Sequence, residues 1–334
     1  MSSPTIKDVA KLAGVSISTV SRVMNDSKPV SPEARRKVLD AIQKLDFKPN
    51  ELARSLVMKR SNMIGVIVKD LGISYMAQIV RGIEEIGRMY KFDILLSSTY
   101  GDLEQEAKII DFMFTKQVEG IIVISENTKP KITYKLKNQA IPFLLIDKLY
   151  DYNDIYTVGI DFYAAAKNMV ECLIEKNHEN ILFLEGAKGS KVASEKERAY
   201  LDVMEKNSLT SHVVECPGIG VEEGYEVGDK VRSEMEANDI SVVFCSEDSI
   251  AIGLMNYFYD NHIKVPETIS VVGFGDIPMA SLYRPALTTV REPFYDIGAV
   301  AMRKLVKELK DKDKLASSAI LSSEIVVRDS ILNL

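Results

Sequence analysis

The residues best suited to binding chemistry lie near the start of the chain, between Thr5 and Asn25. Short polar side chains and one arginine gather there, in the set Thr5, Ser16, Ile17, Ser18, Thr19, Ser21 and Arg22. An arginine can donate two hydrogen bonds to O6 and N7 of guanine, and small side chains let a helix approach the bases in the major groove. We interpret these residues as major-groove contacts, although apolar spacing alone favours an ordinary helical hairpin without a ligand.

Two short helices joined by a tight turn would position these side chains. Thr5 can cap the first helix, with Asp8 three residues further on in a capping box. Gly14 suits the turn because it has no Cβ to clash at positive φ, and Ser16 can cap the second helix. A third helix begins at Ser31-Pro32 and closes a three-helix head. The residues expected to face inward are Val9, Leu12, Ala13, Val20, Val23, Met24, Val38, Ala41, Ile42 and Leu45.

The string from Ile6 to Asn25 resembles the helix-turn-helix of the lac repressor family. The matching runs are Ile6-Lys7-Asp8-Val9-Ala10, Gly14-Val15-Ser16 and Thr19-Val20-Ser21-Arg22-Val23-Met24-Asn25. The resemblance extends over essentially the whole chain. It implies a transcription regulator, a repressor that can also activate, which binds a pseudopalindromic operator in double-stranded DNA as a homodimer.

A short helical stretch follows the head, from Glu51 to Met58. So few residues cannot form a stable helix alone, and the residues by themselves are typical of a flexible linker. The pattern Pro49-Asn50 and Ala53-Arg54-Ser55-Leu56 resembles the hinge helix of the same family. That resemblance implies that Leu56 enters the minor groove, with Asn50 and Ala53 beside it, where an apolar wedge unstacks and bends DNA.

Charge is distributed unevenly along the chain. The formal net charge is −6, but residues 1–60 hold 12 basic and 6 acidic residues, a net of +6. The remainder therefore has 30 basic and 42 acidic residues, a net of −12. This division confines contact with DNA to the head.

The composition predicts a globular cytoplasmic protein without a membrane segment. No apolar run approaches the ~18 residues needed to span a bilayer, and we see no leader sequence. The widely spaced cysteines lack a CxxC pair and favour free thiols in a reducing compartment; they are Cys172, Cys216 and Cys245.

Beyond residue 62, apolar runs alternate with amphipathic stretches, which predicts parallel sheets covered by helices on both faces. Two groups of about six strands predict two lobes, and the family resemblance implies lobes of the periplasmic sugar-binding type, with crossings near residues 160 and 291. The expected domains are a head (1–48), a hinge (49–61), an N-lobe (62–160 plus 292–318) and a C-lobe (161–291 plus 319–334).

Ligands of such sheets bind beyond the carboxyl ends of the strands. The family resemblance places a cleft for a sugar, sugar phosphate or purine there, which we assign to Tyr75, Lys196, Asp248 and Asp276. The chain departs from the family pattern, with Lys196 in place of an arginine and Gly275 in place of the first carboxylate. A cleft without that bidentate arginine should bind sugars poorly. The cleft has either lost the usual effector or been adapted to another.

The helix expected from residue 295 to 307 offers a second site at which a regulatory partner could bind. Its outer face mixes small apolar residues with cations, in the set Tyr295, Asp296, Ala299, Val300, Arg303, Lys304 and Lys307. The alternative is that these basic residues have no partner and only complement the helix dipole, as lysine and arginine late in a helix do. The run Tyr295–Arg303, with Arg81–Glu84 and Met89–Lys91, resembles the branch of the family that controls carbon catabolite repression. It implies docking of serine-phosphorylated HPr, a phosphocarrier protein, with Arg303 as partner of the phosphoserine. Lys304 departs from the apolar residue expected there.

An enzyme is the main alternative to a DNA-binding regulator. The histidines His178, His212 and His262 are scattered, so they predict no metal site. Neither a GxSxG nor an HExxH motif occurs, and Gly186–Lys191 lacks the spacing of a phosphate-binding loop. We predict a protein that is not an enzyme and needs no cofactor.

Overall fold

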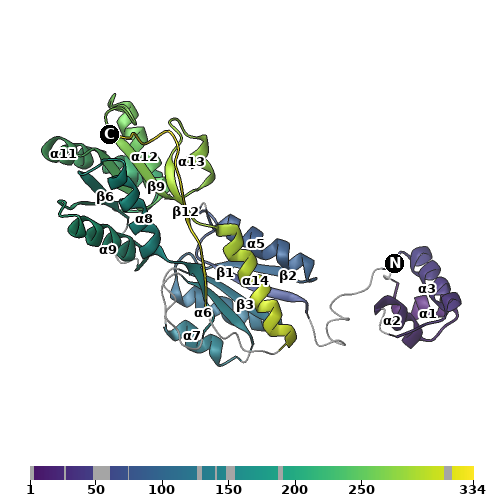
Figure 1. The fold of residues 1–334 in the computed structure, drawn as a ribbon. Helices are drawn as coiled ribbons and strands as arrows, with labels where there is room; N and C mark the ends of the chain where they lie inside the picture. Colours follow the sequence, from purple (N-terminus) through teal and green to yellow (C-terminus); the bar gives the residue numbers. More distant parts are fainter. Residues whose placement is uncertain are drawn as a thin grey trace. The chain divides into compact units, whose positions relative to one another are not determined.

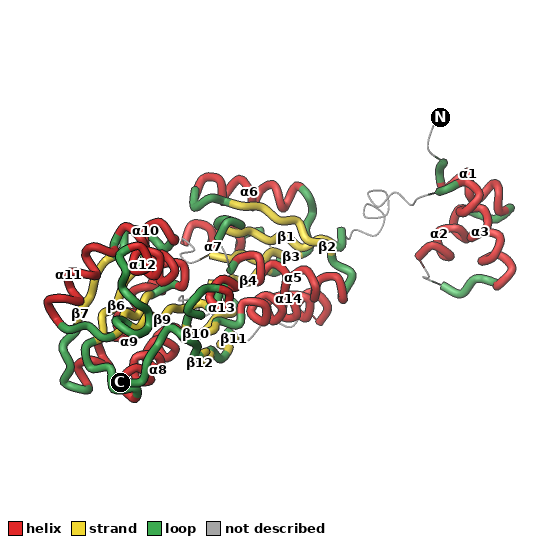
Figure 2. Tube along the Cα trace, turned by 90° about the horizontal axis from the view of Figure 1, so that it is seen from above, coloured by secondary structure: helices red, strands yellow, loops and turns green. Residues whose placement is uncertain are grey.

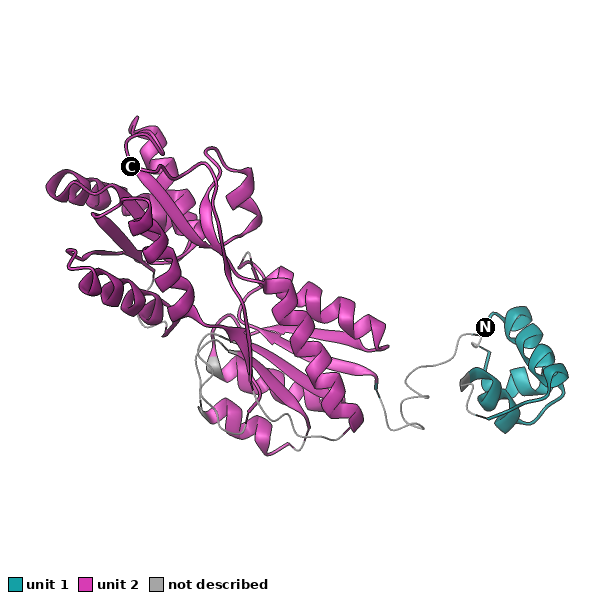
Figure 3. Cartoon of the chain, viewed as in Figure 1, with its two compact units in different colours: residues 1–61 teal, residues 62–334 magenta. Residues whose placement is uncertain are grey.

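The computed structural model describes residues 4–25, 28–47, 61–73, 75–125, 130–139, 141–147, 155–186, 191–311 and 318–334. Contacts divide the chain into two compact units, residues 1–61 and residues 62–334 (Figure 3). Each unit has its own apolar core. Among the described helices, none has the length and apolar character that a bilayer span requires.

The first unit is a bundle of three helices, α1 (Ile6–Ala13), α2 (Ile17–Asn25) and α3 (Pro32–Leu45) (Figure 1). Gly14 follows α1 with a φ of 65°, as its missing Cβ predicts. Ser31 caps α3 by accepting a hydrogen bond from the N–H of Ala34 at 3.3 Å. The bundle is closed by a core of Val9, Ala10, Ala13, Val20, Val23, Val38, Ala41 and Phe47.

One inward position predicted for the head is wrong. Leu12 is 51% exposed, while Val9, Ala10 and Ala13 are the buried residues of α1. A helix turns by about 100° per residue, so Leu12 lies roughly a third of a turn from the middle of that buried side. Met24, Ile42 and Leu45 pack against the core as predicted.

The second unit begins with a four-stranded parallel sheet, the N-lobe sheet, in the order β2-β1-β3-β4. Its strands are β1 (Met63–Val68), β2 (Asp93–Ser98), β3 (Gly120–Ser125) and β4 (Phe143–Asp147). Ile64 and Val66 pack on one face, and Ile67 packs on the other. Helices cover both faces, which explains the continuous apolar runs; they are α5 (Met76–Met89), α6 (Leu103–Thr115), α7 (Pro130–Lys137) and α14 (Phe294–Asp311).

In the described part of the chain, the C-lobe sheet has six strands in the order β12-β10-β9-β8-β6-β7, and of their pairings only β10–β12 is antiparallel. The strands are β6 (Ile181–Glu185), β7 (His212–Glu215), β8 (Val242–Cys245), β9 (Ser270–Gly275), β10 (Thr288–Arg291) and β12 (Glu324–Val326). The helices around it are α8 (Phe162–Glu175), α9 (Lys191–Lys206), α10 (Val221–Glu226), α11 (Gly228–Asn238), α12 (Asp248–Asp260) and α13 (Pro278–Leu282) (Figure 2).

The lobes differ from the expected two groups of six strands, because the described N-lobe sheet has four. β5 (Val158–Ile160) and β11 (Ala319–Leu321) instead form a separate parallel pair, linked to β4 by a bridge between Leu145 and Thr157. The chain passes between the lobes after β5, after β10 and after β11. Because β5 and β11 pair with each other, they do not join the N-lobe sheet as further strands, and that sheet is narrower than expected.

Residues 328–334 return to the C-lobe sheet and are held there by buried side chains. His178 is fully buried, with Nδ1 2.8 Å from Ser241 Oγ and Nε2 3.0 Å from the carbonyl oxygen of Leu332. Ser330 Oγ donates to the carbonyl oxygen of Val271 at 2.5 Å. Burial lowers the pKa of His178, because the cation would lose its hydration.

His178 should make the unfolding free energy of the chain sensitive to acid. The folded chain binds fewer protons than the unfolded one below about pH 6.5, so its stability falls as the pH drops past that value. His178→Gln should flatten this fall between about pH 7 and pH 5, and lower the unfolding free energy near neutral pH by about 1–3 kcal/mol through altered hydrogen bonds. Urea unfolding across pH measures both effects, with the exposed His262→Asn as control. Identical pH slopes for the variant and the unaltered chain would contradict this role.

Candidate functional site

The predicted major-groove residues lie at the start of α1 and along α2. Ser16, Ile17, Ser18 and Arg22 are exposed, whereas Thr19 and Ser21 are half-buried. Val20 and Val23 hold the opposite side of α2 in the core. The bundle therefore presents short side chains and one guanidinium outward on a single helix.

Hydroxyl groups organise the first turns of α1 and α2. Ser16 Oγ accepts a hydrogen bond from the N–H of Thr19 at 3.2 Å and lies 2.8 Å from both Ser18 Oγ and Thr19 Oγ1. At α1, the N–H and Oγ1 of Thr5 both donate to Asp8 Oδ2, at 2.8 and 2.7 Å, and these bonds lower the pKa of Asp8. Hydroxyls and N–H groups at helix starts are typical contacts to DNA phosphates and bases.

The head remains basic in its described part. Residues 4–25 and 28–47 contain 8 Lys and Arg against 4 Asp and Glu, a net charge of +4. A positive surface of this kind attracts a polyanion. The predicted minor-groove residues Asn50, Ala53 and Leu56 lie outside the described residues, as does segment 49–60 of the predicted hinge.

A second candidate surface is built by α5 and α14, which run side by side in the same direction (Figure 1). A Cβ on Gly82 would lie 2.1 Å from the carbonyl oxygen of Tyr295, and one on Gly298 would lie 2.0 Å from that of Ile79. The two helix backbones therefore touch, which only glycine permits. Further along, Lys310 Nζ lies 4.5 Å from the ring centre of Tyr90.

Charged side chains cross this helix pair at its N-terminal end. Tyr295 donates its hydroxyl hydrogen to Glu85 Oε2 at 2.7 Å, and Glu85 Oε1 accepts from Arg81 Nε at 2.8 Å. The hydrogen bond with Arg81 lowers the pKa of Glu85, and the bond to Glu85 raises the pKa of Tyr295. Tyr295 is thereby held in one orientation, with Asp296, Arg303 and Lys307 also exposed on α14.

Three residues of the predicted corepressor face are buried or half-buried and so do not lie fully on it. Ala299 is 3% exposed, because the contact at Gly82 brings α5 over it. Lys304 is half-buried, and its Nζ lies 5.6 Å from the ring centre of Tyr156, next to the first crossing segment. Val300 is half-buried against the core. The departure at Lys304 therefore leaves the exposed face unchanged, whereas the prediction of an exposed Ala299 is wrong.

Lys196, the first of the predicted cleft residues, is fully buried. Its Nζ donates to the carbonyl oxygen of Ser246 at 2.7 Å and to Glu247 Oε1 at 3.1 Å. It also lies 3.7 Å from the ring centre of Phe274. The ammonium is thus bound entirely by groups of the C-lobe.

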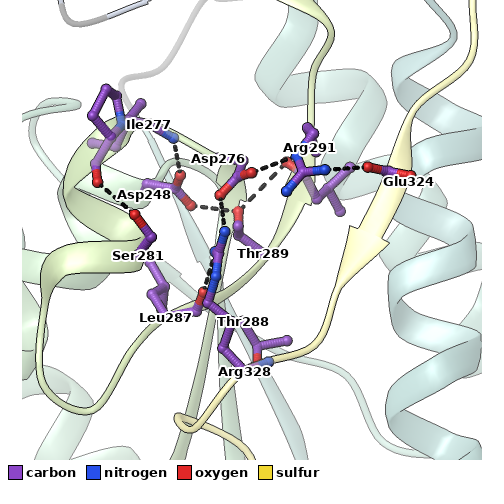
Figure 4. Close-up of polar contacts among 12 residues, drawn as sticks. Asp248, Asp276, Ile277, Ser281, Leu287, Thr288, Thr289, Arg291, Glu324 and Arg328 are labelled. Atoms are coloured by element: carbon purple, nitrogen blue, oxygen red, sulfur yellow. Dashed lines mark hydrogen bonds and ion pairs between the residues drawn. The ribbon is translucent and has the colours of Figure 1, made fainter.

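The remaining residues of the predicted cleft also contact other groups of the chain, and Figure 4 shows the polar contacts of Asp248 and Asp276. Asp248 accepts from the N–H of Ile277 at 2.8 Å and from Thr289 Oγ1 at 2.5 Å, and burial raises its pKa to about 7. Asp276 accepts from Arg291 Nε and from an Arg328 terminal nitrogen, both at 2.6 Å. Tyr75 is 7% exposed and stacks on Phe294 with ring centres 5.0 Å apart.

Comparison with known proteins agrees with this arrangement. The family model described as bacterial regulatory proteins, lacI family, matches residues 5–50, and a periplasmic binding protein-like domain matches residues 170–331. Catabolite control protein A of Priestia megaterium is 35% identical over 330 residues, which cover 98% of each chain. The chain belongs to the lacI family of bacterial regulatory proteins.

Further relatives match between 80% and 99% of this chain. Catabolite control protein A of Staphylococcus epidermidis is 34% identical over 97% of this chain and 98% of its own. The lac repressor dimer bound to operator and an anti-inducer has the same fold, with a TM-score of 0.89 at 24% identity over 99% of this chain and all of that chain. The regulator CcpA of Lactococcus lactis matches with a TM-score of 0.72 at 28% identity, over 80% and 98%.

Membership of the lacI family makes this chain a DNA-binding transcription regulator rather than an enzyme. The helix-turn-helix and the two lobes predicted from sequence are confirmed. Sequence reasoning missed Glu85, which joins Arg81 to Tyr295 across two helices 210 residues apart. The charged pattern Arg81…Glu85 on α5 was visible, but its partner on α14 was not.

Proposed function

We propose that this regulator acts in carbon catabolite control, binding a pseudopalindromic operator as a homodimer with serine-phosphorylated HPr as corepressor. The main support for the proposal is the surface formed by α5 and α14. The similarity to catabolite control protein A supports it further. The proposed site of action is the cytoplasm. The proposed domains are the head (1–48), the hinge (49–61), the N-lobe (62–160 plus 292–318) and the C-lobe (161–291 plus 319–334).

The chemistry of the α5–α14 surface suits a phosphorylated protein partner. Arg303 and Lys307 are exposed one helical turn apart on α14, so both can reach one phosphate. Met89 of α5 is 74% exposed and offers an apolar contact. Tyr295, fixed by Glu85, adds a flat side chain with a polar tip, the type enriched where proteins meet.

A second copy of the chain fits an apolar surface on the C-lobe. The exposed apolar side chains of α10 and α13 are Val221, Tyr225, Met279 and Leu282, the last 67% exposed. Both helices adjoin α12, through the α10–α12 contact and the hydrogen bond from Tyr283 to Asn256. Exposed apolar patches mark protein interfaces, and a two-fold operator requires two heads.

The proposed mechanism is a linkage between the lobes and the head. A corepressor that binds one lobe arrangement more tightly shifts the chain towards it, by no more than its difference in affinity for the two states. That arrangement would bring two hinge segments together on DNA. Leu56, with Asn50 and Ala53, would then enter the minor groove.

The alternative is a repressor controlled by a sugar or sugar phosphate in the cleft, alone or beside HPr. The internal pairing of Lys196, Asp248 and Asp276 weighs against it. A sugar would have to displace these bonds before it could form its own.

Arg303→Ala should abolish stimulation of operator binding by serine-phosphorylated HPr while basal DNA binding is retained. A charge-assisted bond to phosphate is roughly twice as strong as a neutral one, so its loss should weaken docking about tenfold or more. Mobility-shift assays with phosphorylated HPr, unphosphorylated HPr or sugars, added separately, measure the response.

Arg232→Ala is the matched control, because Arg232 is an exposed arginine of α11 paired with Glu236. Retained stimulation of Arg303→Ala would exclude the corepressor site. A response to sugars alone would favour the cleft-controlled alternative.

A further inference from the structure

Lys196 occupies an unusual position for a lysine. It is a residue of α9 and is fully buried. Its ammonium lies over the carboxyl ends of two parallel strands, since Ser246 and Glu247 follow β8 and Phe274 lies near the end of β9. The carboxyl edge of a parallel sheet is where such folds bind their ligands.

The groups around the ammonium form a complete cation-binding box. The carbonyl oxygen of Ser246 and Glu247 Oε1 accept its hydrogen bonds, at 2.7 and 3.1 Å. The Phe274 ring centre lies 3.7 Å from Nζ and that of Phe162 lies 5.6 Å away, with the two rings stacked 6.0 Å apart. Aromatic faces together with carbonyl and carboxylate oxygens are what proteins use to bind ammonium ions.

The box also joins parts of the chain that are distant in sequence. Lys196 lies on α9 and its oxygen partners lie directly before α12. Phe162 begins α8, directly after the first crossing segment. A diffusible ligand bound at this edge would connect the same elements. Lys196 makes the connection permanent, because its ammonium cannot leave.

We propose that Lys196 is a tethered cation that occupies the carboxyl edge of the C-lobe sheet in place of a diffusible effector. This deepens the proposed function, in which a protein partner replaces a sugar. It predicts that the C-lobe keeps one arrangement whether or not sugars are present. DNA binding would then be regulated by partners that bind to other surfaces of the protein.

Chemical rescue tests the proposal. Lys196→Ala retains Cβ and removes the Cγ, Cδ, Cε and Nζ atoms, so n-propylammonium is the missing fragment. Breaking a buried ion pair should lower Tm of the full chain by at least about 6 °C. Added at about 50 mM, n-propylammonium should then raise Tm of this variant by about 2–4 °C, whereas 1-propanol should not.

Two controls separate this effect from general changes in stability. Lys206→Ala removes a 70% exposed lysine from the same helix and should show neither the loss nor the rescue. Lys196→Met fills the volume without a charge, and n-propylammonium should not stabilise it. Equal effects of n-propylammonium and 1-propanol on Lys196→Ala would overturn the proposal.

A measurement on the unaltered chain covers the case in which Lys196→Ala does not fold. Glucose, ribose and glucose 6-phosphate should each leave its Tm unchanged, and a clear shift with any of them would overturn the proposal. None of these readouts involves HPr or DNA. Failure here therefore leaves the corepressor experiment to be judged separately.

Discussion

Arg22→Ala should reduce affinity for the specific operator roughly 5- to 150-fold, because a bidentate arginine–guanine contact contributes about 1–3 kcal/mol. Arg22 is exposed on α2, and the neighbouring Val20 and Val23 keep the helix in the core. The substitution should therefore leave the fold of the head intact. The substitution should remove the sequence preference at one base pair of each operator half-site.

Mobility-shift titrations with operators altered one base pair at a time measure this effect. Arg22→Ala should bind the original operator and the operator altered at its own base pair with similar affinity. Lys44→Ala, which removes an exposed cation from the end of α3, should preserve the base preference. An unchanged operator preference in Arg22→Ala would refute the assigned contact.

Gly298→Ala should lower the unfolding free energy by about 3 kcal/mol or more, at the upper end for overpacked cores. The added Cβ would lie 2.0 Å from the carbonyl oxygen of Ile79 and 3.1 Å from the N–H nitrogen of Ile83. Both are backbone atoms of a helix, so no side-chain rotation relieves the clash. The helices must separate, which also moves Tyr295 away from Glu85.

Urea unfolding of the full chain measures the loss of stability, and HPr-stimulated DNA binding measures the loss of the surface. Gly87→Ala is the matched control on α5, where the nearest atoms would be 3.3 Å or more from the new Cβ. It should cost less than about 1.5 kcal/mol. Equal stability of Gly298→Ala and the unaltered chain would contradict the tight helix contact.

Local patterns predicted the elements of this protein well, because they depend on neighbouring residues. The caps at Thr5 and Ser31 follow from side chains that reach their own helix. The runs Ile64–Val68 and Val242–Cys245 are buried strands, as their length and apolar character predict. Leu12 was wrongly predicted to face inward. Helical spacing shows which residues of α1 point in similar directions, but it does not show how wide the buried side of the helix is.

The functional surfaces were predicted in part. Tyr295, Asp296, Arg303 and Lys307 are exposed together, since helical periodicity sets which residues share a side. Ala299 shares that spacing but is covered by α5. Its burial depends on Gly82, more than 200 residues earlier, and no local pattern contains that contact.

The amino-acid sequence by itself determined that this protein has a DNA-binding head and two α/β lobes, since both follow from short-range spacing and the family resemblance. Only the tertiary structure decided which polar groups remain available to partners. Lys196 reads as a weakened sugar contact in the sequence, yet its ammonium is bound by oxygens 50 and 51 residues further along the chain. A buried charge must find partners wherever folding brings them, and those partners decide its role.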